Sequence, residues 1–274
     1  MVDGAIVACP SHNGDECYQG LYKDLKKMES KTQKLKAVHF LSTDTMDVYL
    51  PVEDRATGRA VVACPGGSYN HLNMPPAESW VRFFTNRGIA AVILKYHLPD
   101  GSGEEAMNDV IDAFATLRAK AEEWRINPED IGIAGYSAGG HLASLMATRY
   151  QKAIRASFQI LFYPVTTMFE DFGDTNCRNN FLGEDKMSEQ IEAKYSAIKQ
   201  ITPDTPRAFI VVCSDDDIVK PFNSANYYVK LQEQGIPSQL IVYPLGKHGW
   251  GIGVGDFPYT DDLKQQLTEW LKGF

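Results

Sequence analysis

The chain has 274 residues, 44% of them hydrophobic, and its 35 acidic residues outnumber the 27 basic ones for a formal net charge of -8. That length and composition suffice to bury one large core, so we expect one globular domain. The net charge and the lack of a lysine or arginine cluster argue against nucleic acid or an anionic membrane as a partner.

The amino-terminal segment, residues 1–36, is polar, and we place the domain at residues 37–274. This segment lacks a basic stretch followed by an apolar core, which is the pattern of an export signal. No other stretch of the sequence is long and apolar enough to span a bilayer. As written, the chain is predicted to be cytoplasmic, and a mature fragment of a secreted protein is the open alternative.

Strand and helix patterns alternate through the rest of the chain, which predicts a mainly parallel sheet covered by helices on both faces. Alternation or continuous apolar runs indicate strands at residues 47–50, 60–64, 131–134, 158–163, 208–213 and 239–243. Apolar residues at helical spacing predict helices at residues 76–87, 104–123 and 261–272. The sequence shows neither an internal repeat nor a low-complexity tract.

The most informative motif is Gly-Tyr-Ser-Ala-Gly at residues 135–139, between an apolar strand and a helix-compatible stretch at 141–147. A sharp strand-to-helix turn of this kind exposes a serine hydroxyl as a nucleophile, here Ser137. The turn brings the flanking backbone close together, so it favours the glycines at both ends of the motif. We therefore expect Ser137 to be a catalytic nucleophile.

A serine nucleophile needs a base and an acid, and these follow it in the chain in the fold that uses this turn. The strand at 208–213 leads into Ser-Asp-Asp-Asp at 214–217, and the strand at 239–243 leads through a short loop to His248. His248 is the predicted base. Position in the sequence alone does not distinguish which of the three aspartates is the acid.

Five other histidines compete with His248 for the role of base. His12, His39, His71 and His97 all precede the serine in the chain, which is the wrong order. His141 lies one helical turn beyond Ser137 and is the serious rival in space. A histidine on the helix that carries the nucleophile is more often a structural residue, so we keep His248.

Acyl transfer also needs donors for the developing oxyanion. The backbone N–H of Ala138, directly after the nucleophile, is the first expected donor. The loop after the strand at 60–64 contains Gly67 and Ser68, whose N–H groups are the other candidates. Tyr69 and Trp250 adjoin residues already placed at this centre, so we predict that their aromatic faces line the substrate site.

About forty residues separate two expected strands, and we place an insertion at about residues 165–205. Such an insertion often covers the active site. Its residues Phe169, Phe172, Phe181, Asn179 and Asn180 are candidates for a binding wall, and the alternative is that they anchor the insertion to the domain. The five cysteines, at positions 9, 17, 64, 177 and 213, show no zinc spacing, so we expect free thiols and no metal.

Several segments together carry a family resemblance. They are residues 64–69 (CPGGSY), 94–98 (LKYHL), 124–128 (WRINP), 135–143 (GYSAGGHLA) and 214–217 (SDDD) with Pro221. From about residue 46 to its end, the chain resembles the α/β-hydrolase esterases of the acetyl-xylan-esterase and feruloyl-esterase-like group. The resemblance implies an α/β-hydrolase fold with a small cap-like insertion. It also assigns the acid to Asp217, four residues before Pro221, and the base to His248.

The expected function is that of a serine carboxylesterase that forms an acyl-enzyme at Ser137. The resemblance alone suggests a short acyl group, above all acetyl on a carbohydrate such as xylan, as the substrate, and it implies no cofactor. An aryl-formamide hydrolase or a small peptidase would use the same groups. A catalytically silent homologue that binds sugar or peptide is the alternative from another class, and the oligomeric state stays open.

Overall fold

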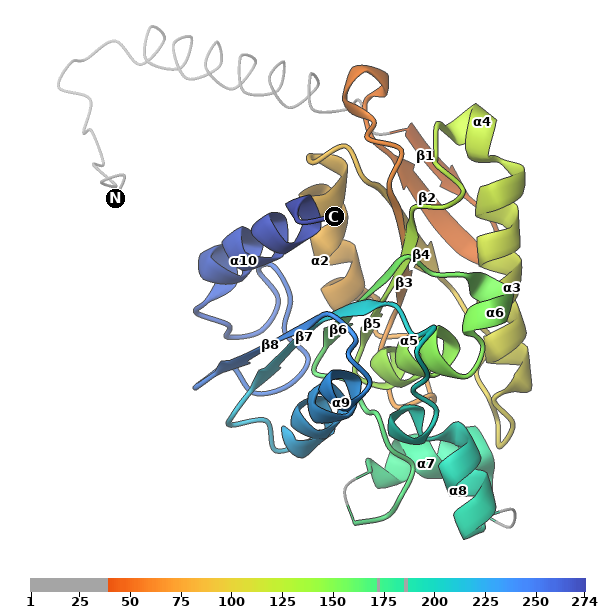
Figure 1. Ribbon diagram of the computed structural model, residues 1–274, viewed down its shortest axis with the longest axis vertical. Helices are drawn as coiled ribbons and strands as arrows, with labels where there is room; N and C mark the ends of the chain where they lie inside the picture. The colour runs from red at the N-terminus through yellow and green to blue at the C-terminus, as the bar shows by residue number, and fades with distance from the viewer. Residues whose placement is uncertain (1–38, 172, 185–186) are drawn as a thin grey trace, which may run out of the picture. The chain divides into compact units, whose positions relative to one another are not determined.

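The computed structural model describes residues 39–171, 173–184 and 187–274. The expected polar segment 1–36, His12, Cys9, Cys17 and Phe172 lie outside the described residues. The described chain forms one eight-stranded sheet in the order β1-β2-β4-β3-β5-β6-β7-β8 (Figure 1). The strands are β1 His39–Ser42, β2 Met46–Leu50, β3 Ala60–Cys64, β4 Ala90–Leu94, β5 Ile131–Tyr136, β6 Phe158–Phe162, β7 Arg207–Cys213 and β8 Ser238–Tyr243.

The sheet is parallel from β4 to β8, whereas β2 runs antiparallel to both β1 and β4. The central strands β3, β4, β5 and β6 are buried along their whole length, as expected of strands covered on both faces. Their continuous apolar sequences follow from this burial. The mainly parallel sheet expected from the sequence is confirmed.

Helices cover both faces of the sheet (Figure 1). On one face, α2 Met74–Thr85 and α10 Thr260–Lys272 share a core with the strands through Trp80, Phe84, Leu263 and Leu267. On the other face, α3 Glu104–Ala119, α5 Ala138–Thr148 and α9 Phe222–Glu233 contribute Phe114, Leu142, Met146, Tyr227 and Leu231 to a second core. The single helix expected at 104–123 is interrupted at Lys120 and continues as the short α4 Ala121–Trp124.

The insertion between β6 and β7 contains α7 Thr175–Leu182, α8 Glu189–Tyr195 and the 3-10 helix η3 Ala197–Lys199. Asp174 and Ser188 begin the two α-helices by accepting hydrogen bonds from the N–H groups of Cys177 and Ile191. Side-chain acceptors at these positions satisfy N–H groups that have no partner inside the helix. The remaining short elements are the 3-10 helix η1 Glu53–Arg55 and α6 Gln151–Ile154. No helix in the described ranges has both the length and the apolar character to cross a bilayer.

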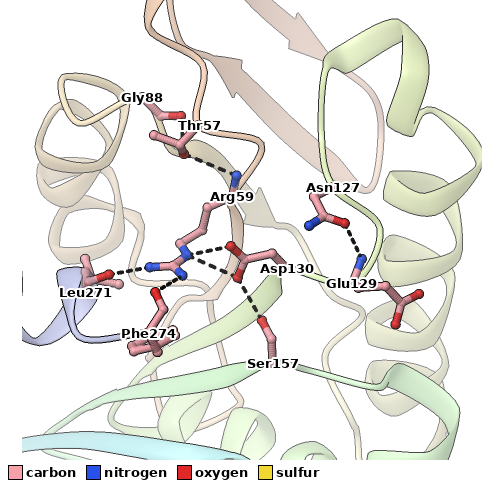
Figure 2. Close-up of polar contacts among 9 residues, drawn as sticks. All are labelled: Thr57, Arg59, Gly88, Asn127, Glu129, Asp130, Ser157, Leu271 and Phe274. Carbon is pink, nitrogen blue, oxygen red and sulfur yellow. Dashed lines mark hydrogen bonds and ion pairs between the residues drawn. The ribbon is translucent and has the colours of Figure 1, made fainter.

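At the amino ends of the parallel strands, Arg59 ties the last helix to the sheet (Figure 2). Its Nε donates to both carboxylate oxygens of Asp130, at 3.1 and 2.9 Å. Its terminal nitrogens donate to the carbonyl oxygens of Leu271 and Phe274, at 2.5 and 2.9 Å. This network fixes the edge of the sheet that lies opposite the carboxyl ends of the strands.

Candidate active site

Ser137 occupies the sharp turn between β5 and α5, with φ 56° and ψ -118°. This left-handed conformation is unusual for a residue other than glycine and marks a turn held by its surroundings. A Cβ at Gly135 would lie 2.2 Å from the carbonyl oxygen of Gly139, and one at Gly139 would lie 2.0 Å from that of Cys64. The two glycines of the motif are therefore required by backbone contacts.

Ser137, His248 and Asp216 form a continuous row of hydrogen bonds. His248 Nε2 lies 2.7 Å from Ser137 Oγ, and His248 Nδ1 lies 2.7 Å from Asp216 Oδ2. The Asp216 side chain is fully buried, and that of His248 is 9% exposed. A carboxylate accepts from Nδ1–H, so Nε2 carries the lone pair that faces the serine hydroxyl.

The carboxylate that contacts His248 is therefore Asp216, and the assignment to Asp217 is wrong in this respect. Asp216 is buried and its Oδ1 accepts from the N–H groups of Ile218 and Val219, at 3.1 and 2.9 Å. This local turn points the Asp216 side chain inward, whereas Asp217 is exposed. All three aspartates follow the same strand, so the spacing in the sequence did not distinguish them.

The third aspartate, Asp215, holds the loop that carries the histidine. Its carboxylate accepts from the N–H groups of Gly246 and Lys247, at 3.3 and 2.9 Å. Gly246 and Lys247 have φ 142° and 54°, and the second value is unfavourable for a residue other than glycine. Asp215 thus stabilises the conformation that presents His248 to Ser137.

Tyr163 supports the other side of the histidine, which the sequence did not indicate. Its ring packs on the His248 ring with centroids 4.7 Å apart, and its hydroxyl donates to the Trp250 carbonyl oxygen at 2.6 Å. Tyr163 follows β6 directly and has φ 39°. The only sequence signal was its position at the carboxyl end of a buried strand.

Trp250 and Tyr69 do not form the exposed aromatic walls expected from the sequence. Trp250 is fully buried and stacks on Phe257 with centroids 3.9 Å apart. Tyr69 is 1% exposed and its hydroxyl lies 2.7 Å from His141 Nδ1. Both rings turn into the core, because adjacency in sequence to a site residue does not determine where a side chain points.

The loop between β3 and α2, residues 65–73, lies against the nucleophile turn. A Cβ at Gly66 would lie 2.8 Å from the Tyr136 carbonyl oxygen and 3.1 Å from Ser137 Cβ. The backbone of the loop at Gly66 therefore packs directly against the turn that carries Ser137. Gly67, Ser68 and Tyr69 have φ 118°, 49° and 63° in succession.

The rival His141 is buried and both of its ring nitrogens have partners. Nδ1 faces the Tyr69 hydroxyl, and Nε2 lies 2.7 Å from the Tyr195 carbonyl oxygen. Burial lowers the pKa of His141 to about 4, and the hydrogen bond to Tyr195 offsets this in part. Its ring contacts the loop and the insertion, and the histidine in hydrogen-bond contact with Ser137 Oγ is His248.

Two other histidines with described side chains lie in exposed surroundings. His97 contacts the Asp109 carboxylate at 2.9 Å, and this carboxylate also accepts from the His97 N–H at 2.7 Å. The hydrogen bond and charge of Asp109 raise the pKa of His97. The His71 ring contacts the Asn70 side chain. Neither histidine is in hydrogen-bond contact with Ser137.

The insertion supplies anchors to this region. Phe181 is 1% exposed and packs on Tyr69 and His141, with ring centroids 4.9 Å apart in both cases. Asn180 Nδ2 donates to the Ser68 carbonyl oxygen at 2.8 Å, whereas Asn179 contacts Glu184. Phe181 and Asn180 therefore anchor the insertion to the rest of the domain, which was the alternative to a binding wall.

An open cavity of about 780 Å³ adjoins His248. It is lined by Asp215, Leu245, Gly246, Lys247, His248, Gly255, Asp256, Phe257 and Pro258. Leu245 is 58% exposed there, so the cavity offers apolar surface as well as charged groups. It provides room for a bulky group next to the histidine.

The described cysteines Cys64, Cys177 and Cys213 are free and buried. Burial raises the pKa of each thiol, to about 12 for Cys213, so these groups stay protonated at neutral pH. Within the described ranges, no three His, Cys, Asp or Glu side chains form a group that could hold a metal ion.

Comparisons with known proteins show which sequences this chain is similar to. A family model described as BD-FAE matches residues 46–231, more than half of the chain. An acetylxylan esterase of Xylanibacter ruminicola is 34% identical over 260 residues, which cover 92% of this chain and 53% of the relative. The chain thus spans about half the length of that curated relative.

Solved structures extend the similarity to the fold. The acetyl ester-xyloside bifunctional hydrolase from Caldicellulosiruptor lactoaceticus is 26% identical with a TM-score of 0.74, covering 83% of this chain and 87% of that one. An alpha/beta hydrolase enzyme from a Medee basin deep-sea metagenome library is 20% identical with a TM-score of 0.65, covering 86% and 95%. Together with the sheet order, these similarities confirm the α/β-hydrolase fold.

Proposed function

The chain belongs to the BD-FAE family, and from that premise we propose that it is a serine carboxylesterase that works through an acyl-enzyme. The observation that carries the proposal is the row of hydrogen bonds from Asp216 through His248 to Ser137. A serine hydroxyl is a weak nucleophile until a neighbouring base takes its proton. This row supplies the base and the acid that orients it.

In the acylation step, Ser137 Oγ attacks the ester carbonyl carbon while His248 Nε2 accepts the hydroxyl proton. Asp216 accepts from Nδ1–H and stabilises the imidazolium that forms. When the tetrahedral intermediate collapses, the bond between carbon and the leaving oxygen breaks. His248 then gives its proton to the leaving alcohol, and the acyl group remains on Ser137.

In the deacylation step, water takes the place of the alcohol. His248 accepts a proton from this water as its oxygen attacks the acyl carbon. The second intermediate collapses by breaking the bond to Ser137 Oγ, which recovers its proton from His248. The carboxylic acid leaves and the free enzyme is restored.

The N–H groups of Ala138, Gly67 and Ser68 are the proposed donors to the oxyanion. Ala138 is the first residue of α5, so its N–H has no partner within the helix and lies at the positive end of the helix dipole. The approach of the β3–α2 loop to Ser137 supports the other two. Removing one such donor in an esterase typically costs about 3 kcal/mol of transition-state stabilisation.

The proposed substrate is a short acyl ester, above all acetyl, on a carbohydrate such as xylan. Support comes from the similar proteins, which are an acetylxylan esterase and an acetyl ester-xyloside hydrolase. The cavity beside His248 agrees with a bulky leaving group, because His248 is the residue that would protonate the leaving oxygen.

The test is acetate release from acetylated xylo-oligosaccharides and from p-nitrophenyl acetate, with Ser137→Ala as the control. We expect the wild type to be active on both and the variant to lose about four orders of magnitude or more in kcat. Butyryl and feruloyl esters and an aryl formamide complete the comparison. Equal rates for wild type and variant would favour a silent binding protein, and activity on the feruloyl ester or the formamide alone would replace the acetyl assignment.

A further inference from the structure

We propose that His141, through Tyr69, and Asn180, through the Ser68 carbonyl, are positioning residues that hold the β3–α2 loop in the conformation that presents its N–H groups to the oxyanion. The inference rests on the proposed function. It assigns a role to a buried histidine and to an asparagine of the insertion that the triad does not use.

The β3–α2 loop needs such support because its backbone is strained. Three successive residues, Gly67, Ser68 and Tyr69, have positive φ, and two of them are not glycine. A left-handed conformation is unfavourable for a residue other than glycine because its Cβ comes too close to the following carbonyl oxygen. A loop with this conformation persists only where its surroundings hold it.

The carbonyl groups of the loop show how its N–H groups are aimed. The oxygens of Pro65, Gly66, Gly67 and Ser68 accept hydrogen bonds from Tyr96 Oη, Asn73 N, Asn70 N and Asn180 Nδ2, at 2.8, 2.9, 3.0 and 2.8 Å. In a trans peptide the N–H points away from the carbonyl of the preceding residue, and no described peptide bond is cis. Fixing these four oxygens therefore fixes the direction of the N–H groups of residues 66–69.

The carbonyl oxygens of Gly66 and Gly67 are held by donors within the loop. Those of Pro65 and Ser68 are held from outside it, by Tyr96 and Asn180. Asn180 belongs to α7 of the insertion. If its amide were lost, the peptide between Ser68 and Tyr69 would be free to rotate. The insertion is thus coupled through one hydrogen bond to the peptide that directly follows the proposed donor Ser68.

Tyr69 is held at its other end by His141. The Tyr195 carbonyl oxygen can only accept, so His141 Nε2 carries the hydrogen and Nδ1 accepts from the Tyr69 hydroxyl. Phe181 packs on the rings of Tyr69 and His141 and excludes solvent from them. A row of hydrogen bonds therefore runs from the end of α8 through the nucleophile helix α5 to the strained loop.

The first experiment removes the hydroxyl of Tyr69. Tyr69→Phe keeps the ring, and Tyr227→Phe is the matched control because Tyr227 is also buried and its hydroxyl donates to Gln159 at 2.9 Å. Both variants lose one buried hydrogen bond, so we expect similar losses of melting temperature. On p-nitrophenyl acetate, Tyr69→Phe should lower kcat about 10- to 100-fold with KM within about threefold, because loose donors fail in the transition state. Tyr227→Phe should keep the wild-type kcat.

The second experiment varies His141 and Asn180. His141→Leu should lower kcat about as much as Tyr69→Phe, and His141→Asn, whose amide oxygen can replace Nδ1 as acceptor, should restore most of it. Asn180→Asp places a carboxylate oxygen against the Ser68 carbonyl and should lower kcat about tenfold. Asn86→Asp makes the same change at an exposed position at the end of α2 and should leave kcat unchanged.

Inhibition by an alkyl trifluoromethyl ketone separates positioning from general damage, because its adduct with Ser137 carries an oxyanion. In Tyr69→Phe, His141→Leu and Asn180→Asp, we expect the Ki of this inhibitor to rise by the same factor by which kcat/KM falls. Folded Tyr69→Phe and Asn180→Asp proteins with wild-type kcat and Ki would overturn this inference alone. A wild type without Ser137-dependent ester hydrolysis would overturn the proposed function, and this inference with it.

Discussion

The sheet has one edge at the amino ends of its parallel strands and another at their carboxyl ends. Each carries a carboxylate hydrogen-bonded to a nitrogen base, but the two serve different tasks. At the amino edge, Arg59 donates to Asp130 and to two backbone carbonyls, so its network ends on acceptors that do not react. At the carboxyl edge, the row that begins at Asp216 passes through His248 and ends on the Ser137 hydroxyl. The first network fixes structure, and the second leaves a proton that can move.

Backbone strain divides between the edges in the same way. Six of the eight described non-glycine residues with positive φ follow the carboxyl ends of strands. They are Ser68, Tyr69, Asp100, Ser137, Tyr163 and Lys247. The other two, Arg125 and Arg155, end the short helices α4 and α6, where a left-handed residue is an ordinary helix stop. Strain gathers where the site is, as expected of a preorganised centre.

After the loss of the Ser137 hydroxyl itself, Asp216→Asn should produce the largest change of any substitution at these edges. The amide cannot stabilise the imidazolium and favours the wrong tautomer of His248, so kcat/KM for p-nitrophenyl acetate should fall about 10³- to 10⁴-fold. The melting temperature should change little because the side chains have the same shape. Steady-state kinetics at pH 8 measure the effect.

Asp217→Asn is the matched control for Asp216→Asn, because the two residues are adjacent and Asp217 is exposed. It should retain kcat/KM within about twofold. If Asp217→Asn lowered kcat/KM strongly and Asp216→Asn did not, Asp216 would not be the acid that orients His248.

How far the sequence predicts this site depends on which kind of information places each residue. Gly135, Ser137 and Gly139 were predictable because the turn imposes its own sterics. His248 was predictable because chain order excluded four other histidines and His141 lies on the helix that follows Ser137. Asp216 was not, since three adjacent aspartates share one spacing and the choice depends on a local turn.

The same distinction applies to the fold. The central strands β3, β5 and β6 were predictable because continuous apolar runs reflect burial on both faces, and β3 has the expected bounds. The central strand β4 has an apolar run of the same kind but was not among the expected strands. The edge strand β1 and the break between α3 and α4 carry no such signal. Tyr69 points into the core through its contact with His141, which lies far away in the sequence, and Trp250 points there through its stacking on Phe257 in the loop before α10.

The next effect is on stability and comes from His141. Its pKa is about 4 in the folded protein and about 6.5 in an unfolded chain. The unfolded state therefore binds an extra proton between these values, and this contribution to stability is complete above pH 6.5 and is lost as pH falls toward 4. At 1.36 kcal/mol for each pKa unit, the loss is about 3 kcal/mol.

Urea unfolding of wild type and His141→Asn between pH 7 and pH 4 measures this contribution. The groups that face His141 are the Tyr69 hydroxyl, the Tyr195 carbonyl oxygen and the Phe181 ring. Burial raises the pKa of Tyr69, so its hydroxyl stays protonated in this range. His97, whose pKa is raised, titrates in both proteins and cancels in the difference. Parallel pH profiles for the two proteins would show that His141 is not a buried neutral base.

Arg59→Met tests the amino edge. It removes the partner of Asp130 and the donors to Leu271 and Phe274, so the free energy of unfolding should fall by about 2 kcal/mol, less than for a fully buried pair because Asp130 is 27% exposed. The kcat of the folded variant should equal that of the wild type. An Arg59→Met variant with the wild-type free energy of unfolding but a lower kcat would contradict the division of tasks between the two edges.

The smallest expected effect comes from Asp215, which acts on His248 through the loop. Asp215→Ala removes the acceptor for Gly246 and Lys247, and kcat/KM should fall about fivefold, equivalent to about 1 kcal/mol for two partly exposed hydrogen bonds. Asp215→Asn keeps one acceptor oxygen and should recover most of the rate. Equal losses in the two variants would mean that the charge of Asp215, rather than its hold on the loop, acts on the histidine.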